Sequence, residues 1–245
     1  MIKIKETQVK ELANNIVSLI RNISLTTNVK TLPEIQMDCD WNAGSKDKYF
    51  LLLQTIKNLV AGEKKLLSAT VRLYQYKYYK KTGIPPVDRG LLMCYNMGNL
   101  KNPDTRNSIL EPEELKKYMQ GLPGYSLPLD IALPIFSWKV LFRNKKYAGL
   151  INELPEQLLK NKPTIKQSGN NFEILQYSSI NGYTFQPGDL IREEAINFNE
   201  LIKAENILTE KLTTQHFSVV LYHLDSITLS KFSTHDLETV FDYLH

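Results

Sequence analysis

Two carboxylates at the end of one short apolar segment are the clearest chemical signal in the sequence. Asp38 and Asp40 lie two residues apart in the stretch Glu34–Asp40. Because side chains alternate along a strand, both carboxylates would lie on one face, roughly 7 Å apart. Such a coupled pair can transfer protons, hydrogen-bond sugar hydroxyls or bind a hard cation. The alternative is a structural pair held by backbone amides and by Arg72.

Polar and aromatic side chains also follow four other apolar segments of the chain. In a sheet of parallel strands, functional residues gather at the carboxyl ends of the strands. His223 and Asp225 repeat the two-residue spacing of the first pair. Together with the acids of residues 38–40 they could form a metal site, and the alternative is a hydrogen-bonded histidine beside a helix-capping aspartate. The other candidates for ligand contact are Trp41, Asn42, Arg72, Tyr95, Asn96 and Trp138.

Apolar periodicity indicates which elements must position these residues. Apolar, strand-forming runs predict strands over residues 34–40, 66–74, 90–96, 129–136 and 217–223. Helical spacing of apolar residues predicts amphipathic helices over 8–22, after Ser45, after Pro112, over 200–212 and after Ser233. Strands that alternate with helices indicate parallel βα units. The sequence therefore predicts an α/β fold built from five such units.

One segment, residues 143–195, breaks the alternation. It contains Asn181-Gly182 between two strand-like runs. Asn-Gly in that position is the strongest short signal for a β-hairpin. We therefore expect a single barrel-like domain over residues 1–245, with residues 143–195 forming an inserted α+β hairpin subdomain after the fourth strand.

The number of units allows two architectures. A complete (β/α) barrel requires eight units in about 250 residues, whereas five parallel strands suit an open doubly wound sheet. They equally suit the last five units of a TIM-barrel-like fold, a partial barrel with two unpaired sheet edges. If Met1 is the natural start, three βα units are missing, and we expect the protein to be marginally stable, dimeric or inactive.

Composition excludes several classes of protein. With 42% hydrophobic and 23% charged residues in 245, the chain is globular and not disordered. Its two cysteines cannot build a disulfide-rich scaffold. No run of about 18 apolar residues exists, so we expect no membrane span. The N-terminus lacks a signal-peptide core; glycan-handling proteins are often exported, and the localisation stays open.

The segment Tyr74–Lys81 interleaves tyrosines with lysines. Such a pattern can stack on single-stranded nucleic acid, line a carbohydrate cleft or form a solvated loop. The net charge of +4 is spread along the chain, unlike the concentrated charge of most nucleic-acid binders. The position of the segment after the second strand favours the cleft, so we predict no nucleic-acid partner.

Several of these residues resemble one family of enzymes. Asp-Cys-Asp-Trp-Asn, residues 38–42, resembles the Asp-x-Asp-Trp-Glu strand of family 18 glycoside hydrolases, which are chitinase-like. Residues 93–96 (Met-Cys-Tyr-Asn) and 133–136 are similar to two later motifs, Met-x-Tyr-Asp and Gly-Leu-Pro-x-Tyr-Gly. The resemblance implies that the five strands are the fourth to eighth of a barrel. The chain also resembles Bacteroidetes proteins with an Asp-Cys-Asp-Trp strand, which implies no activity.

The departures from that family concern catalysis. Its proton-donating Glu would fall at Asn42, and a primary amide cannot protonate a leaving oxygen. Loss of general-acid help costs roughly 10²–10⁴-fold in rate. The resemblance implies that Asp40 orients a substrate acetamide and that Tyr95 helps to hold it. An acid could still be supplied by Asp40, if burial raises its pKa, or by Asp225.

The sequence therefore predicts a glycosidase-like domain that binds a saccharide at the carboxyl ends of its strands and could hydrolyse it. The rival prediction is a non-catalytic carbohydrate-binding or structural protein on a degenerate glycosidase scaffold. A third is a metal-dependent hydrolase using the acids of residues 38–40 with His223 and Asp225. We predict a carbohydrate ligand, no cofactor and no resident metal. The candidate catalytic residues are Asp38, Asp40 and Asp225; the candidate binding residues are Asn42, Tyr95, Asn96, Trp138, Trp41, Arg72 and His223.

Overall fold

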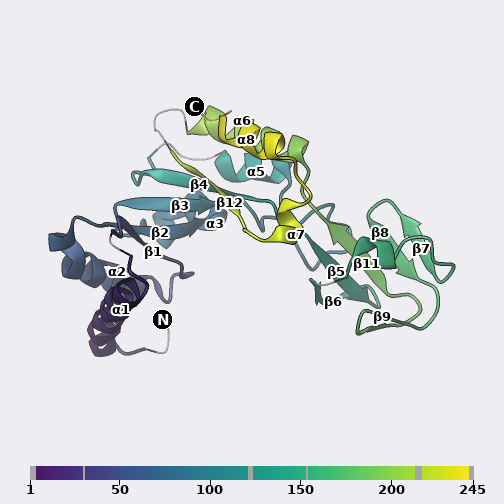
Figure 1. The fold of residues 1–245 in the computed structure, drawn as a ribbon, viewed down its shortest axis with the longest axis horizontal. Helices are drawn as coiled ribbons and strands as arrows, with labels where there is room; N and C mark the ends of the chain where they lie inside the picture. Colours follow the sequence, from purple (N-terminus) through teal and green to yellow (C-terminus); the bar gives the residue numbers. More distant parts are fainter. Residues whose placement is uncertain (1–3, 30, 121–123, 153, 213–216, 243–245) are drawn as a thin grey trace. The chain divides into compact units, whose positions relative to one another are not determined.

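The computed structural model describes residues 4–29, 31–120, 124–152, 154–212 and 217–242. The first part of the chain contains α1 (Glu6–Thr26), β1 (Glu34–Met37), α2 (Lys46–Val60), η1 (Ala61–Glu63), β2 (Leu66–Arg72), α3 (Leu73–Lys77), α4 (Tyr79–Thr82), β3 (Arg89–Met93), α5 (Pro112–Met119) and β4 (Leu129–Pro134) (Figure 1). The second part contains β5 (Trp138–Arg143), β6 (Lys146–Ile151), η2 (Glu156–Leu158), β7 (Ile165–Ser168), β8 (Asn171–Ile174), β9 (Ser178–Ile180), β10 (Tyr183–Phe185), β11 (Leu190–Glu194), α6 (Phe198–Lys211), β12 (Val219–Tyr222), α7 (Ser226–Leu229) and α8 (Thr234–Asp242). No helix among these is long and apolar enough to cross a bilayer.

The five predicted strands form one sheet in the order β1-β2-β3-β4-β12. The pairs β1–β2, β2–β3 and β3–β4 are parallel. The strand order follows the chain without the reversal that marks a doubly wound sheet. The sheet forms a half-barrel, so the predicted partial (β/α) barrel is confirmed and the doubly wound alternative is wrong.

The chain divides into two compact units. The first contains Met1–Met93, Tyr118–Ala132 and Leu212–Val220, and the second contains Cys94–Lys117, Leu133–Lys211 and Leu221–His245. The division therefore passes through β4 and β12, and each unit is described by itself below.

Amphipathic helices cover the first unit. In α1 the buried residues are Val9, Ala13 and Val17, which follow the helical period. This stripe packs against α2, where Tyr49 and Leu53 are fully buried. The predicted helix over 8–22 is confirmed, and α1 extends beyond the predicted range at both ends.

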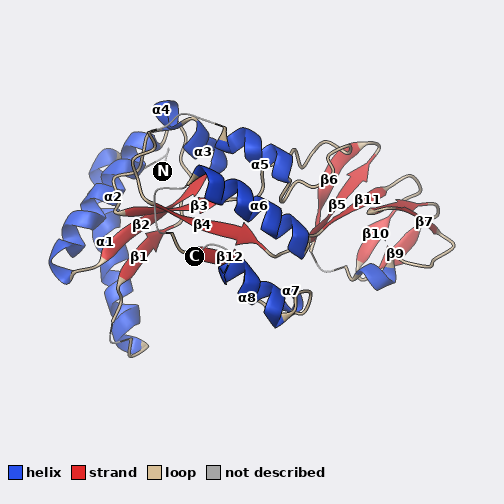
Figure 2. Cartoon of the chain, turned by 90° about the horizontal axis from the view of Figure 1, so that it is seen from above, coloured by secondary structure: helices blue, strands red, loops and turns tan. Residues whose placement is uncertain are grey.

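The insertion in the second unit is an antiparallel sheet in the order β6-β5-β11-β8-β7, with β9 and β10 forming a separate hairpin (Figure 2). The hairpin turns at Asn181-Gly182, and both residues adopt positive φ, as a tight turn between paired strands requires. The predicted hairpin is confirmed. The sheet begins at Trp138, before the predicted insertion start at residue 143. Its own core consists of Ile151, Leu154, Leu159, Ile165, Phe172, Ile174, Ile180, Phe185 and Ile191.

One buried residue of the second unit conflicts with its surroundings. Glu205 lies on the apolar face of α6, with Leu201 and Leu208 one helical turn before and after it. Its side chain is fully buried, and neither carboxylate oxygen has a hydrogen-bond partner among the described residues. Burial raises the pKa of the Glu205 carboxyl to about 8, because an apolar environment disfavours the charged form.

Two segments differ from the sequence-based expectation. The strand predicted over 66–74 ends at Arg72, because α3 begins at Leu73. The Gln75 side chain accepts a hydrogen bond from the Arg72 amide and starts that helix. A solvated loop was one of the structures predicted for the basic segment after this strand. That segment instead forms the helices α3 and α4.

Candidate functional site

The register of two neighbouring strands positions the acidic pair. β1 and β2 pair in parallel with Met37 opposite Ala69. Continuing that register beyond the end of β1 brings Asp38 opposite Thr70 and Asp40 opposite Arg72. The structure has both contacts: the Thr70 hydroxyl donates to Asp38 Oδ1 over 2.8 Å, and Arg72 forms an ion pair with Asp40.

These contacts bear on the proposed acid chemistry. The Asp40 side chain is half-exposed and its charge is matched by Arg72. A general acid at neutral pH instead needs a buried or like-charged environment that holds its proton. The ion pair with Arg72, which the sequence allowed as a structural alternative, is therefore present. The Asp40 side chain lacks the burial that its role as a general acid requires.

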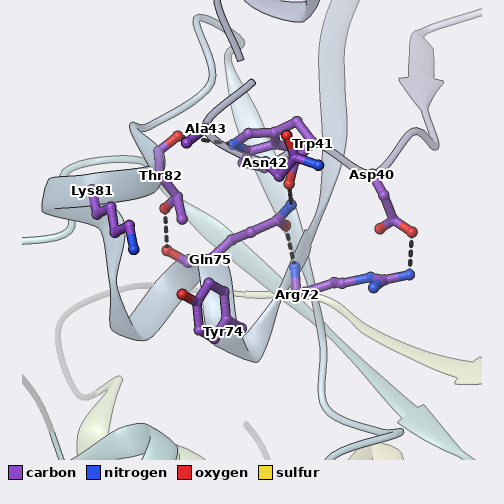
Figure 3. Close-up of a pocket in the computed structure, with 9 residues that line it drawn as sticks. All are labelled: Asp40, Trp41, Asn42, Ala43, Arg72, Tyr74, Gln75, Lys81 and Thr82. Carbon is purple, nitrogen blue, oxygen red and sulfur yellow. Dashed lines mark hydrogen bonds and ion pairs between the residues drawn. The ribbon is translucent and has the colours of Figure 1, made fainter. Parts of the chain in front are cut away.

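A pocket of about 440 Å³ opens beside Asp40 in the first unit (Figure 3). Gln75 forms its framework, with a buried side-chain amide that donates to the Trp41 carbonyl oxygen over 3.0 Å. The Thr82 hydroxyl donates to the Gln75 carbonyl oxygen, also over 3.0 Å. These bonds fix the segment after β1 to α3 and α4. The pocket is lined by Asp40, Trp41, Asn42, Ala43, Arg72, Tyr74, Gln75, Lys81 and Thr82.

Trp41 and Asn42 both take part in this framework. The Trp41 ring is only 5% exposed, stacks on Tyr49 and donates its N–H to the Thr82 carbonyl over 2.9 Å. It therefore presents little aromatic surface to a ligand. Asn42 is exposed, and its side-chain oxygen accepts from the Gly44 amide, which shapes the turn before α2.

An aromatic cluster is the main feature of the second unit. Tyr95 and Tyr222 stack with ring centroids 5.4 Å apart and planes 10° apart. Phe136 meets both rings edge-on, at 5.9 Å and 5.8 Å. The rings of Trp138 and His223 also contact Phe136, with their centroids 5.3 Å and 6.2 Å from the Phe136 centroid. These five side chains are called the aromatic cluster below. Tyr95, Phe136 and His223 follow β3, β4 and β12, whereas Tyr222 ends β12 and Trp138 begins β5.

The cluster combines a rigid base with an accessible ring. Phe136 is buried, whereas Tyr222 is 47% exposed. Asn96, beside Tyr95, adopts a left-handed backbone conformation that asparagine tolerates, and its amide donates to the Ile109 carbonyl. Tyr222 and Phe136 lie at the ends of two predicted strands but were not among the sequence-predicted site residues.

His223 and Asp225 are close together, as their spacing predicted. His223 Nε2 lies 2.7 Å from Asp225 Oδ2. Asp225 also caps α7, accepting from the Thr228 hydroxyl and amide. The hydroxyl bond and then the amide bond hold the pKa of Asp225 below its ordinary value. Asp225 is therefore ionised at neutral pH, which argues against its predicted role as proton donor and for the helix-cap alternative.

A buried ion pair orients Trp138. Glu194 accepts from the Trp138 indole N–H over 2.7 Å and from the Ser108 hydroxyl over 2.5 Å. Arg192 pairs with the same carboxylate, and neither side chain reaches solvent appreciably. Arg192 also donates to the Asn102 carbonyl over 2.7 Å. Sequence reasoning missed Arg192 and Glu194, although their two-residue spacing, which places opposite charges on one face of a strand, was the available signal.

The structure thus brings the sequence-predicted residues together in two groups. The first unit holds Asp38, Asp40, Trp41, Asn42 and Arg72, and the second holds Tyr95, Asn96, Trp138, His223 and Asp225. Within the described ranges, no three His, Cys, Asp or Glu side chains gather in a way that could hold a metal ion.

Comparison with known proteins extends the description of the fold. No protein-family model and no curated protein matches the sequence. Similar solved structures include the Group IV chitinase of Ostrinia furnacalis (11% identity, TM-score 0.52, covering 95% of this chain and 72% of that chain). Others are the GH18 chitinase ChiB of Flavobacterium johnsoniae (13%, 0.51, 97% and 68%) and the spore cortex-lytic enzyme SleL of Bacillus megaterium QM B1551 (13%, 0.53, 88% and 50%).

These likenesses concern the fold. The chain has a chitinase-like fold, which confirms the predicted resemblance at that level. It spans half the length of the SleL chain. The individual motif matches and the likeness to Bacteroidetes proteins stay predictions.

Proposed function

We propose that the second unit binds a saccharide on its aromatic cluster and that the domain does not hydrolyse it. The observation that supports this most is the exposed Tyr222 ring, which is stacked on Tyr95 and contacted edge-on by the buried Phe136. A fixed aromatic face packs against the C–H groups of a pyranose ring with little loss of side-chain entropy. His223 and Asp225, at the edge of the same face, offer polar groups for sugar hydroxyls.

The chemistry of the candidate acids favours binding over turnover. Asn42 stands where the resembled family has its proton donor. Asp225 is a helix cap with a lowered pKa, and Asp40 is paired with Arg72. Asn42 has no acidic proton to give, Asp225 holds its charge as a helix cap, and the Asp40 side chain is half-exposed, so none of the three has the environment of a general acid. The glycosidase-like fold is compatible with either outcome, since a fold alone does not determine an activity.

Direct titration with neutral oligosaccharides tests the proposal. Isothermal titration with N-acetylated chitotriose and with cellotriose is expected to show binding to at least one of them. Tyr222→Ala should weaken it by about tenfold, the contribution of one aromatic contact. Tyr177→Ala is the matched control, because Tyr177 is 76% exposed and lies outside the cluster.

Three outcomes count against the proposal. Failure of both oligosaccharides to bind, or equal loss in the two tyrosine variants, contradicts binding at the cluster. Release of reducing ends during incubation contradicts the absence of hydrolysis. If Asp40→Asn then abolished that release, the enzyme prediction would replace the binding one.

A further inference from the structure

The segment Arg72–Thr82 has an unusual distribution of charge. It contains four basic residues and four tyrosines but no acidic residue. The chain as a whole is nearly balanced, with 30 basic and 26 acidic residues. This segment is therefore locally cationic, and it lies beside the pocket of the first unit.

α3 and α4 sort these side chains into two sets. Tyr76 and Tyr79 pack on Tyr125, with ring centroids 5.2 Å and 5.7 Å apart. Tyr74 and Tyr78 instead remain 49% and 44% exposed, and their rings lie 4.7 Å from each other. The first set anchors the helices, and the second leaves a pair of aromatic rings at the surface.

The basic side chains divide in the same way. Lys77 lies over the rings of Tyr78 and Tyr118, at 5.6 Å and 5.5 Å, so its charge stabilises the local packing. Lys80 and Lys81 are exposed, and no carboxylate in the described part of the chain lies within ion-pair distance of either. Among the described residues, these two lysine charges are thus uncompensated.

Tyr74 and Lys81 also line the pocket, where they lie on the α3–α4 side and Asp40 with Arg72 lies on the other (Figure 3). The lining therefore presents two cations against one carboxylate, which leaves one net positive charge. The Asp40 carboxylate accepts hydrogen bonds from hydroxyl groups, and the Asn42 amide can both donate and accept them. An exposed ring, an excess cation and hydroxyl-bonding groups lie around one cavity.

From this arrangement we propose that the pocket and the Tyr74–Tyr78 surface bind an acidic polysaccharide. A uronate ring would stack on Tyr74, and its carboxylate would pair with Lys81 and, along the chain, with Lys80. The inference uses none of the residues that carry the proposed function of the second unit, so either can fail alone.

A saccharide fits these groups better than a nucleic acid does. A phosphate backbone and a polyuronate both carry one negative charge per unit, so the groups beside the charge must distinguish them. Here Asp40, which is paired with Arg72, and Asn42 supply groups that hydrogen-bond hydroxyls, and a uronate ring offers more hydroxyls than a deoxynucleotide does. Uronate residues carry one carboxylate and several hydroxyls each, which matches one excess cation beside an acceptor.

Affinity measurements with three polymers test this site in the full chain. Polygalacturonate is the acidic glycan, hydroxyethyl cellulose is the neutral glycan and oligo(dT) is the nucleic acid. We expect polygalacturonate to bind at least tenfold more tightly than the other two at 50 mM NaCl. Added salt should weaken that binding, because surface ion pairs are screened.

Two pairs of variants locate the binding. The double variant Lys80→Gln/Lys81→Gln should lose at least tenfold in affinity for polygalacturonate. Lys145→Gln/Lys146→Gln, at the exposed β5–β6 turn, removes the same charge and should change the affinity less than twofold. Tyr74→Ala should likewise weaken binding, whereas Tyr177→Ala should not.

Each contrary outcome overturns the inference in its own way. Tighter binding of oligo(dT), with the same dependence on Lys80 and Lys81, would assign the surface to nucleic acid. Equal losses in both lysine pairs would show non-specific attraction to a basic protein. If polygalacturonate does not bind while the trisaccharides still bind in a Tyr222-dependent manner, this inference fails and the proposed function stands.

Discussion

Glu205 provides a test of the packing in the second unit. Its carboxyl pKa rises from an ordinary 4.5 to about 8 because the side chain is buried. Between pH 4.5 and 8 the folded protein keeps a proton on this group, and the unfolded protein releases it. The native state thus binds more protons, so the free energy of unfolding falls as the pH rises through this window. One pKa unit corresponds to about 1.4 kcal/mol, so the loss is at most ~5 kcal/mol.

Glu205→Gln removes this ionisation. The variant should be more stable than the wild type at pH 8, by up to ~5 kcal/mol, and close to it at pH 5. Glu210→Gln is the matched control, because Glu210 lies on the same helix and is exposed. Its stability should follow that of the wild type at both pH values.

Urea unfolding measured by tryptophan fluorescence gives the required numbers. A Trp41→Phe background leaves Trp138 as the reporter, and Trp138 belongs to the same unit as Glu205. A difference between Glu205→Gln and the wild type that is the same at pH 5 and pH 8 would refute the reasoning. So would a wild-type stability that rises over this range while the variant is flat.

Two further substitutions test the framework of the two candidate sites. Glu194→Gln leaves the buried Arg192 without its counter-charge, so we expect a loss of about 3–5 kcal/mol in urea unfolding; a loss below about 1 kcal/mol would contradict the ion pair. Gly83→Ala should cost about 1–3 kcal/mol, since Gly83 has φ +80° and an added Cβ would lie 2.8 Å from the Phe50 ring. Gly62→Ala, which meets nothing within 4 Å, should be nearly neutral, and an equal cost at both glycines would show that the clash is absent.

Local patterns predicted the elements of the half-barrel well. The strand over 129–136 was recognisable from its nearly continuous apolar run, and the structure buries every position of Leu129–Pro134. The Asn181-Gly182 hairpin was recognisable because its turn needs positive φ. The helices α3 and α4 were missed, since a segment of alternating tyrosine and lysine has no apolar periodicity to reveal a helix.

The candidate site was predictable only where contacts follow the strand register. Arg72 was predicted as a charge partner of the acidic pair, and the structure pairs it with Asp40. Glu194 accepts from Ser108, a residue 86 positions away, which no local pattern reports. Tyr222 was missed because its exposure depends on its position at the edge strand β12, which depends on the strand order.

Simultaneous measurement of binding and turnover on one saccharide tests the central claim most directly. The protein would be titrated with N-acetylated chitotriose and cellotriose by calorimetry, and the same samples would be assayed for new reducing ends after prolonged incubation. The account predicts saturable binding that requires Tyr222, with no new reducing ends. Reducing ends that accumulate with the wild type and not with Asp40→Asn, or an absence of any binding, would contradict it.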